Sequence, residues 1–377
     1  MAKLMDICEI QYGFAFDSKK FTNDSSYPQL VRIRDIKKGY SETFYAGEYS
    51  EDYVLQAGAL LVGMDGEFNI AKWKKDGALL NQRVCKLTAK KGIDEEYLRF
   101  AMARVLKILE HRTSFVTVKH LSARDLNKLE IMIPDLEMQK NISRVLVLFE
   151  KLISCKKEEL NLLEELVKAR FIEVFGDMLL NSKSWREIRL DSVAGIVSGI
   201  TKGRKIKSAE LYEVPYMAVS NVKNGYIDWT KVKTIMATKE EIKRYKLLPN
   251  DVLMTEGGDP DKLGRGAIIK CPPNNCIHQN HIFRVRLNEE LLPIYFEYYL
   301  QQIKAKRYFL KCSKQTTGIA SINMKQLLAL PVLIPDMESQ KTFAKFTEQA
   351  DKSKAVIEKS LKELETLQAS LMQKYFS

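Results

Sequence analysis

Residues 133–140 read Ile-Pro-Asp-Leu-Glu-Met-Gln-Lys, and residues 334–341 read Ile-Pro-Asp-Met-Glu-Ser-Gln-Lys. At this offset of 201 positions, apolar residues before the two stretches also coincide: Val118, Leu121, Leu126 and Leu129 fall on Ile319, Ile322, Leu327 and Leu330. Nearer the N-terminus the offset is 186, and Leu4, Ile7, Ile10 and Gly13 match Leu190, Val193, Ile196 and Gly199. Matches in the same order indicate an internal repeat. The chain is therefore predicted to contain one fold twice, with small insertions in the second copy.

A long helix is predicted directly after each copy of this stretch. From Asp135 to about Phe175 there is no Gly or Pro, and apolar residues recur at the four-and-three spacing of a coiled-coil seam. Asp135 stands where an N-cap is expected, and Gly176 where the helix should stop. The predicted seam residues are Ile142, Leu146, Phe149, Ile153, Leu160 and Leu163 in the first helix, and Phe343, Phe346, Ile357, Leu361, Leu364 and Leu371 in the second. Two unrelated amphipathic surface helices are the alternative.

The rest of each half mixes short apolar or alternating runs with Gly, Pro and Asn turns, which is typical of an α+β domain. Leu30–Arg34, Gly58–Val62 and His281–Val285 are predicted strands, and Glu95–Glu110 and Leu291–Phe309 are predicted helices. The predicted architecture is two homologous α+β domains separated by two long helices that pack as an antiparallel coiled coil. The predicted segments are 1–134 and 181–335 for the domains, and 135–180 and 336–377 for the helices.

Composition favours a polyanionic partner. Sixty Lys and Arg stand against 48 Asp and Glu, a formal net charge of +12, and nucleic acid is the commonest partner of such a chain. No run of 18 apolar residues is present, and the N-terminus lacks the apolar core of a signal peptide. The six cysteines are scattered, as suits reduced thiols. We therefore expect a cytoplasmic protein with no membrane partner.

The two helix starts resemble a signature of the specificity (S) subunits of type I restriction-modification enzymes. The matching residues are Pro134, Leu136, Gln139 and Ile142, then Pro335, Met337, Gln340 and Phe343. Three further features resemble the family: the end of the first helix at 162–177, the pair Trp185 and Leu190, and Asn280-His281. The resemblance covers essentially the whole chain. Met138 and Ser339 depart from it, because the family usually has Glu there.

This resemblance implies a division of labour. Each domain would read one half of a bipartite double-stranded DNA target, and the helices would set the half-site spacing and dock two modification (methyltransferase) subunits. S-adenosylmethionine, ATP and Mg would be bound by those subunits and by the restriction/translocase subunits. This chain would then need no cofactor and be no enzyme. No phosphate-binding glycine loop or aminomethyltransferase motif occurs, and Asp135, Glu137 and Lys140 have the wrong spacing for a nuclease.

Candidate DNA contacts fall in loops of both halves. Basic residues would bind phosphates, and amides and Arg would pair with base edges. The candidates are Lys72, Lys74 and Lys75; Asn81, Gln82 and Arg83; Thr201, Lys202, Arg204, Lys205 and Lys207; Lys262 and Arg265; and Gln279, Asn280 and His281.

Each candidate has a structural alternative. The charge runs could simply be solvated, and the amides could satisfy neighbouring backbone groups. Cys271, Cys276, His278 and His281 suggest zinc, but the first half has no such cluster, so no metal is expected. Two rival functions remain: a coiled-coil scaffold that binds RNA or acidic proteins, and a self-contained enzyme acting on DNA.

Overall fold

The computed structural model describes residues 1–377 except 67, 113–119, 206–209, 260–262, 317–318 and 377. It divides into two compact units. The first unit comprises Met1–Glu159 and Ile357–Ser377, and the second comprises Leu160–Val356. Each unit therefore contains one globular part, the near half of one long helix and the far half of the other. The four predicted segments divide the chain differently and stay a prediction.

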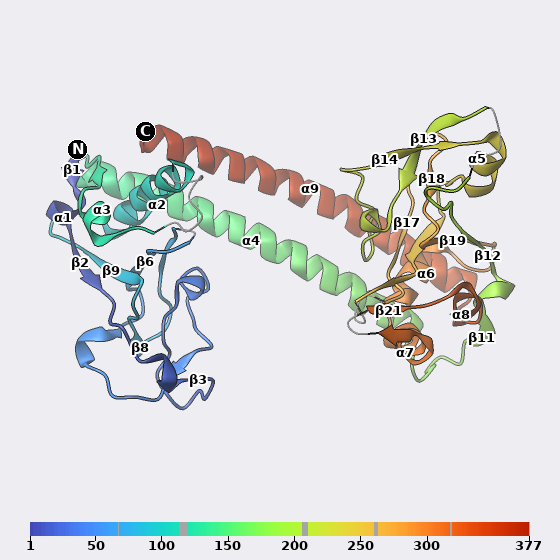
Figure 1. Cartoon of the computed structure of the whole chain (residues 1–377), viewed down its shortest axis with the longest axis horizontal. Coiled ribbons are helices and arrows are strands. Elements are labelled where there is room, and N and C mark those ends of the chain that lie inside the picture. Colours follow the sequence, from blue (N-terminus) through green and yellow to red (C-terminus); the bar gives the residue numbers. More distant parts are fainter. Residues whose placement is uncertain (67, 113–119, 206–209, 260–262, 317–318, 377) are drawn as a thin grey trace. The chain divides into compact units, whose positions relative to one another are not determined.

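The globular part of the first unit is built on one four-stranded antiparallel sheet, in the order β2-β9-β6-β7 (Figure 1). Two-stranded ladders, β1-β10, β3-β4 and β5-β8, complete it. Its strands are β1 (Ala2–Lys3), β2 (Cys8–Tyr12), β3 (Phe21–Thr22), β4 (Phe44–Tyr45), β5 (Val54–Leu55), β6 (Leu60–Gly63), β7 (Ile70–Lys72), β8 (Ala78–Leu79), β9 (Val84–Ala89) and β10 (Glu130–Ile131). Its helices are α1 (Leu4–Ile7), α2 (Glu95–Arg112) and α3 (Ala123–Asn127).

The second unit repeats this sheet in the order β12-β19-β15-β17. Two three-stranded sheets, β14-β13-β18 and β16-β21-β20, and the ladder β11-β22 lie beside it. The strands are β11 (Arg186–Arg189), β12 (Ala194–Ser198), β13 (Tyr212–Met217), β14 (Lys233–Ala237), β15 (Val252–Thr255), β16 (Gly257–Gly258), β17 (Gly266–Ile268), β18 (Ile277–His278), β19 (Ile282–Leu287), β20 (Lys314–Thr316), β21 (Ile319–Ser321) and β22 (Pro331–Ile334). The helices are α5 (Lys239–Tyr245), α6 (Pro293–Leu300), α7 (Ile303–Cys312) and α8 (Met324–Leu328).

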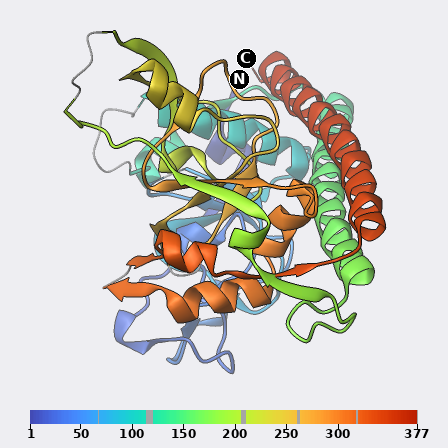
Figure 2. The same cartoon turned by 90° about the vertical axis from the view of Figure 1, so that its right-hand side faces the viewer.

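The two long helices are α4 (Leu136–Phe175) and α9 (Met337–Tyr375), and they run side by side (Figures 1 and 2). In the first unit Lys157 of α4 pairs with Glu365 of α9 (2.9 Å). In the second unit Lys354 of α9 pairs with Glu164 of α4 (2.8 Å). Lys157 precedes Glu164 along α4, whereas its partner Glu365 follows Lys354 along α9. The two helices are therefore antiparallel, as predicted.

The predicted ends of α4 are confirmed. The Met138 backbone N–H donates to Asp135 Oδ1 (2.8 Å), which satisfies one of the unpaired donors of the first turn. Gly176 has a φ of +78° and donates to Ile172 O (2.7 Å), the left-handed stop that glycine adopts at low cost. Of the twelve predicted seam residues, Ile142, Leu146, Ile153 and Phe343 are buried and the other eight are half-buried. Their individual roles in the seam stay predictions.

The signature glutamine explains why each long helix is joined rigidly to a globular part. Gln139 is 1% exposed; its Oε1 accepts from Asp94 N (2.9 Å) and its Nε2 donates to Pro134 O (2.8 Å). Gln340 is 0% exposed and makes the same pair of bonds, with Leu292 N (2.8 Å) and Pro335 O (2.9 Å). A buried amide that is satisfied on both sides fixes the angle at which the helix leaves its domain.

Two predictions of secondary structure were wrong. Leu30–Arg34 is no strand, because the buried carboxylate of Asp35 accepts from Arg32 N (3.3 Å) and closes a 3-10 turn, Ile33–Asp35. Leu291–Phe309 is broken into α6 and α7 at Gln302, whose ψ is 153°. The Gln302 side chain donates to Tyr298 O (3.1 Å), which caps the end of α6 and allows α7 to start in a new direction.

Candidate nucleic-acid interface

The basic loop of the second unit presents only part of its charge to solvent. Thr201, Lys202 and Lys205 are exposed, whereas Arg204 is half-buried. Arg204 Nε donates to Glu241 Oε1 (2.5 Å), and this hydrogen bond raises the pKa of Arg204 and lowers that of Glu241. The guanidinium is thus held by a carboxylate of α5, which leaves the two lysines as the groups best placed for a phosphate.

In the basic segment of the first unit, Lys72–Lys75, one lysine is also held by carboxylates while the other two are exposed. Lys72 Nζ lies 2.8 Å from carboxylate oxygens of both Glu95 and Glu96, at the start of α2. Burial opposes the charge of Lys72, but the two carboxylates outweigh it and raise the pKa of this lysine. Trp73 is 1% exposed, within a core cluster. Lys74 and Lys75 are exposed, with Lys75 Nζ 5.8 Å from the centre of the Tyr40 ring, and no carboxylate holds either of them among the ion pairs of the described residues.

The candidate base readers lie at the start of β9 and β19 and have a shared structural role. Phe14 N donates to Leu80 O and Gln82 N to Phe14 O, and in the second unit Ile200 N donates to His278 O and Asn280 N to Ile200 O. The chain passes so close that a Cβ on Gly13 would meet Asn81 O at 2.0 Å, and one on Gly199 would meet His278 O at 2.0 Å. The repeated glycines are therefore required by backbone approach.

Around this shared frame the candidate side chains differ in exposure. Asn81 is 7% exposed, and Gln279 is half-buried with its Oε1 accepting from Val219 N (3.4 Å). Gln82 and Arg83 are exposed in the first unit and His281 in the second, whereas Asn280 is half-buried like Gln279. Arg265 is half-buried, and Lys207 and Lys262 lie outside the described residues. For every one of these candidates, contact with DNA stays a prediction.

Three polar residues beside these candidates escaped sequence reasoning. Asp65 and His120 contact one another next to Arg83, and Glu256 accepts from His281 (2.6 Å). The residues of each group are far apart in sequence, and the chain's low number of histidines, four, was the only available signal. In the described residues no three His, Cys, Asp or Glu side chains form a group that could hold a metal ion.

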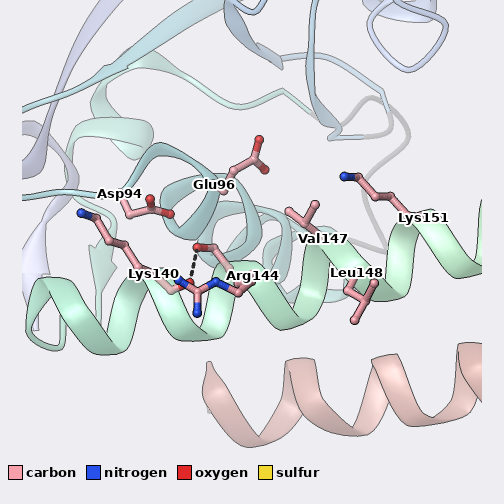
Figure 3. Close-up of a pocket in the computed structure, with 8 residues that line it drawn as sticks. Asp94, Glu96, Lys140, Arg144, Val147, Leu148 and Lys151 are labelled. Carbon is pink, nitrogen blue, oxygen red and sulfur yellow. Dashed lines mark hydrogen bonds between the residues drawn. The ribbon is translucent and has the colours of Figure 1, made fainter.

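A charged groove lies between the start of α2 and the helix α4 in the first unit. Figure 3 shows Asp94 and Glu96 on one side and Lys140, Arg144, Leu148 and Lys151 of α4 on the other. Its volume is about 450 Å³. Leu148 of this groove is 56% exposed, and Val145 and Leu152 of α4 are 37% and 41% exposed. Their spacing is that of a second apolar stripe on this helix. No helix in the described part of the chain is long and apolar enough to cross a membrane.

Known proteins match along most of the chain. The family model of the type I restriction modification DNA specificity domain matches residues 1–165 and 182–366. The chain is 26% identical over 401 residues to the EcoBI specificity subunit of Escherichia coli, covering 98% of this chain and 84% of that subunit. It is 25% identical over 321 residues to the MjaVIII specificity subunit of Methanocaldococcus jannaschii, covering 77% and 73%.

Solved structures show the same fold. The S subunit of the type I restriction-modification system from M. genitalium matches with a TM-score of 0.58 and 16% identity, covering 100% of this chain and 95% of that one. A chain from a structure of complex assembly and conformational transition of the type I R-M system matches with a TM-score of 0.59 and 18% identity, covering 100% and 96%.

Proposed function

This chain belongs to the type I restriction modification DNA specificity domain family, and we propose that it reads a bipartite DNA target, one half-site with each globular part. The family expected from the repeated helix-start signature is confirmed, and with it the role of a specificity subunit in DNA target recognition.

The observation that carries the bipartite target is one backbone frame that bears different side chains in the two units. Gln82 and Arg83 occupy the backbone positions in the first unit that Asn280 and His281 occupy in the second. A base edge is recognised by the pattern of donors and acceptors, so different side chains on equal frames suit different sequences. A protein that read the same half-site twice would have no need for this divergence.

The helices are proposed to dock two modification subunits. In support, the apolar stripe Val145, Leu148 and Leu152 of α4 is flanked by Arg144 and Lys151. This face suits an amphipathic helix with acidic flanks, which we assign to a modification subunit. A relative of this fold was solved in a study of complex assembly of the type I R-M system.

Catalysis is proposed to belong to partner subunits: S-adenosylmethionine in the modification subunits, and ATP and Mg in the restriction/translocase subunits. The relatives that match this chain are specificity subunits, which supports the proposal. Incubating this chain alone with DNA, S-adenosylmethionine and Mg should give neither methylation nor cleavage, and either product would establish the rival enzyme function.

The test of the bipartite target is a domain exchange. Replacing residues 1–134 with the domain of another family member, in the complex with modification subunits, should change one half of the methylated sequence and leave the other unchanged. Mapping methylated adenines in cells with and without the hybrid measures this. A folded hybrid that loses both halves would contradict independent reading, and a wild-type complex without DNA binding would favour the scaffold.

The docking surface has its own test. Replacing Leu148 and Leu152 with Ser should lower the amount of modification subunit that co-purifies with the chain. Val356 and Leu367 of α9 are exposed at 69% and 50%, and the same replacement there serves as the matched control. Equal recovery of the subunit with both pairs of variants would remove the α4 stripe from the interface.

A further inference from the structure

Three backbone segments meet beside the sheet of the first unit. Met64 N donates to Arg83 O (2.9 Å), and Leu121 N donates to Met64 O (2.7 Å). Three polar side chains emerge here: Arg83 Nη1 lies 3.2 Å from His120 Nδ1, Arg83 Nε lies 3.4 Å from Asp65 Oδ2, and His120 Nδ1 contacts the Asp65 carboxylate. We call this meeting point the junction of the unit.

The second unit has the same junction. Glu256 N donates to His281 O (3.0 Å), and Ile322 N donates to Glu256 O (2.8 Å). The Nδ1–H of His281 donates to Glu256 Oε2 (2.6 Å), and Asn280 Nδ2 lies 3.5 Å from His281 Nε2. Both junctions therefore present a histidine held by a carboxylate.

Inheritance from the duplication does not explain these pairs. The backbone bonds make His281 equivalent to Arg83 and Glu256 equivalent to Met64. His120, in contrast, comes from the third segment, before α3. The two histidine–carboxylate pairs are thus built from different backbone positions and converge on one place, and they use two of the chain's four histidines. Because the two units form this pair from different backbone positions, we infer that both junctions need a histidine–carboxylate pair for the same purpose.

That purpose is not the stability of the fold. The side chains of Arg83, His120 and His281 are 54%, 42% and 57% exposed, and exposed ion pairs contribute little to folding. Arg83 also has a φ of +69°, a left-handed conformation that is unfavourable for a long side chain and concentrates at functional sites. What the carboxylates do accomplish is orientation: each holds an Arg or His side chain in one position, which also fixes the positions of its other hydrogen-bonding atoms.

We propose that each junction is the point at which its domain reads a base pair, through Arg83 with His120 in the first unit and His281 with Asn280 in the second. Asp65 and Glu256 are positioning residues. The inference rests on the proposed bipartite target and deepens it. Oriented Arg, His and amide groups match the hydrogen-bonding edges of bases, whereas a phosphate contact requires charge and no fixed orientation.

The experiment uses the complex with modification subunits and a library of randomised half-sites, scored by methylation. His281→Ala should let other base pairs be accepted about ten- to a hundred-fold more readily at one position of one half-site. Arg83→Ala should do the same in the other half-site only. Glu256→Gln keeps an acceptor for the His281 Nδ1–H and should retain the preference, while Glu256→Ala should lose it.

Arg189→Ala is the matched control, because Arg189 is an exposed arginine held by Asp191 in the second unit. It should leave both half-sites unchanged, and the unfolding temperature of every variant should equal that of the wild type. Unchanged preferences in the junction variants would overturn the proposal, as would a uniform loss for all sequences, which marks a phosphate contact. A wild-type complex without sequence preference would instead overturn the proposed function.

Discussion

The ring of Phe376, the penultimate residue of the chain, lies 5.2 Å from the ring of Tyr97 in the core of the first unit. The second unit has the same contact between Phe175, at the end of α4, and Tyr295, at 4.7 Å. Each domain is therefore completed by the end of the long helix that follows the other domain.

Phe376→Ala should destabilise the first unit by about 1–2 kcal/mol, less than the ~3–5 kcal/mol of a fully buried Phe, because this ring is half-buried. Amide hydrogen exchange should speed up in β9 and stay unchanged in β19. Leu367→Ala, on an exposed position of the same helix, is the control and should change neither strand. Equal effects on β9 and β19 would show that the contact is not local to the first unit.

Burial raises the pKa of Glu297 to about 7 from 4.5, although Ile268 N donates to its Oε1 (2.8 Å). The folded carboxyl holds its proton to a higher pH than the unfolded one, so this contribution to stability is present at low pH and lost as the pH rises from about 4.5 to about 7. Glu297→Gln keeps the acceptor and removes the charge. It should stabilise the second unit at pH 8 by on the order of 2–3 kcal/mol.

Denaturant unfolding at pH 5 and pH 8 measures this effect, and the variant's gain should shrink at the lower pH. Glu289→Gln, at an exposed position of the same unit, should leave the pH dependence as it is. A gain of equal size at both pH values would mean that the carboxyl of Glu297 is not the group that titrates.

Lys202 and Lys205 are predicted to contact phosphates. Phosphate contacts release counterions, so the double replacement with Ala should reduce the slope of log affinity against log salt by roughly two. The preferred sequence should stay the same. Arg204→Ala should instead destabilise the loop, because it leaves Glu241 without its partner. Titrations of the complex with duplex DNA at several salt concentrations decide, and an unchanged slope would remove this loop from the interface.

The long helices are predicted to set the gap between half-sites. Inserting four residues in α4 between Glu158 and Glu159, and four in α9 between Lys362 and Glu363, keeps Lys157 opposite Glu365. Each helix lengthens by about 6 Å and turns by a net ~40°, so the seam survives as a stutter. The methylated sequence should keep both half-sites with a gap about two base pairs longer.

Two-residue insertions at the same places are the control. They turn the seam by about 200° and bury charge, so the complex should fail to assemble. A four-residue variant that folds and methylates with the original gap would show that the helices do not set the spacing.

The sequence by itself determined the features that depend on local pattern and on repetition. Breaker-free stretches with a coiled-coil period, Asp135 before the first turn and Gly176 after the last are sufficient to place α4, because capping and the left-handed stop are local backbone effects. The repeated Ile-Pro-Asp stretch revealed the duplication, since two copies in one chain can be compared without any other protein.

Only the tertiary structure decided which groups are free to act. Sequence could not show that Arg204 is held by Glu241, nor that Lys72 is held by Glu95 and Glu96, since a charged loop looks the same whether or not a carboxylate faces it. Nor could it bring His120 beside Arg83 or Phe376 beside Tyr97. Such contacts depend on chain segments that meet through packing, and sequence separation carries no record of distance in the folded state.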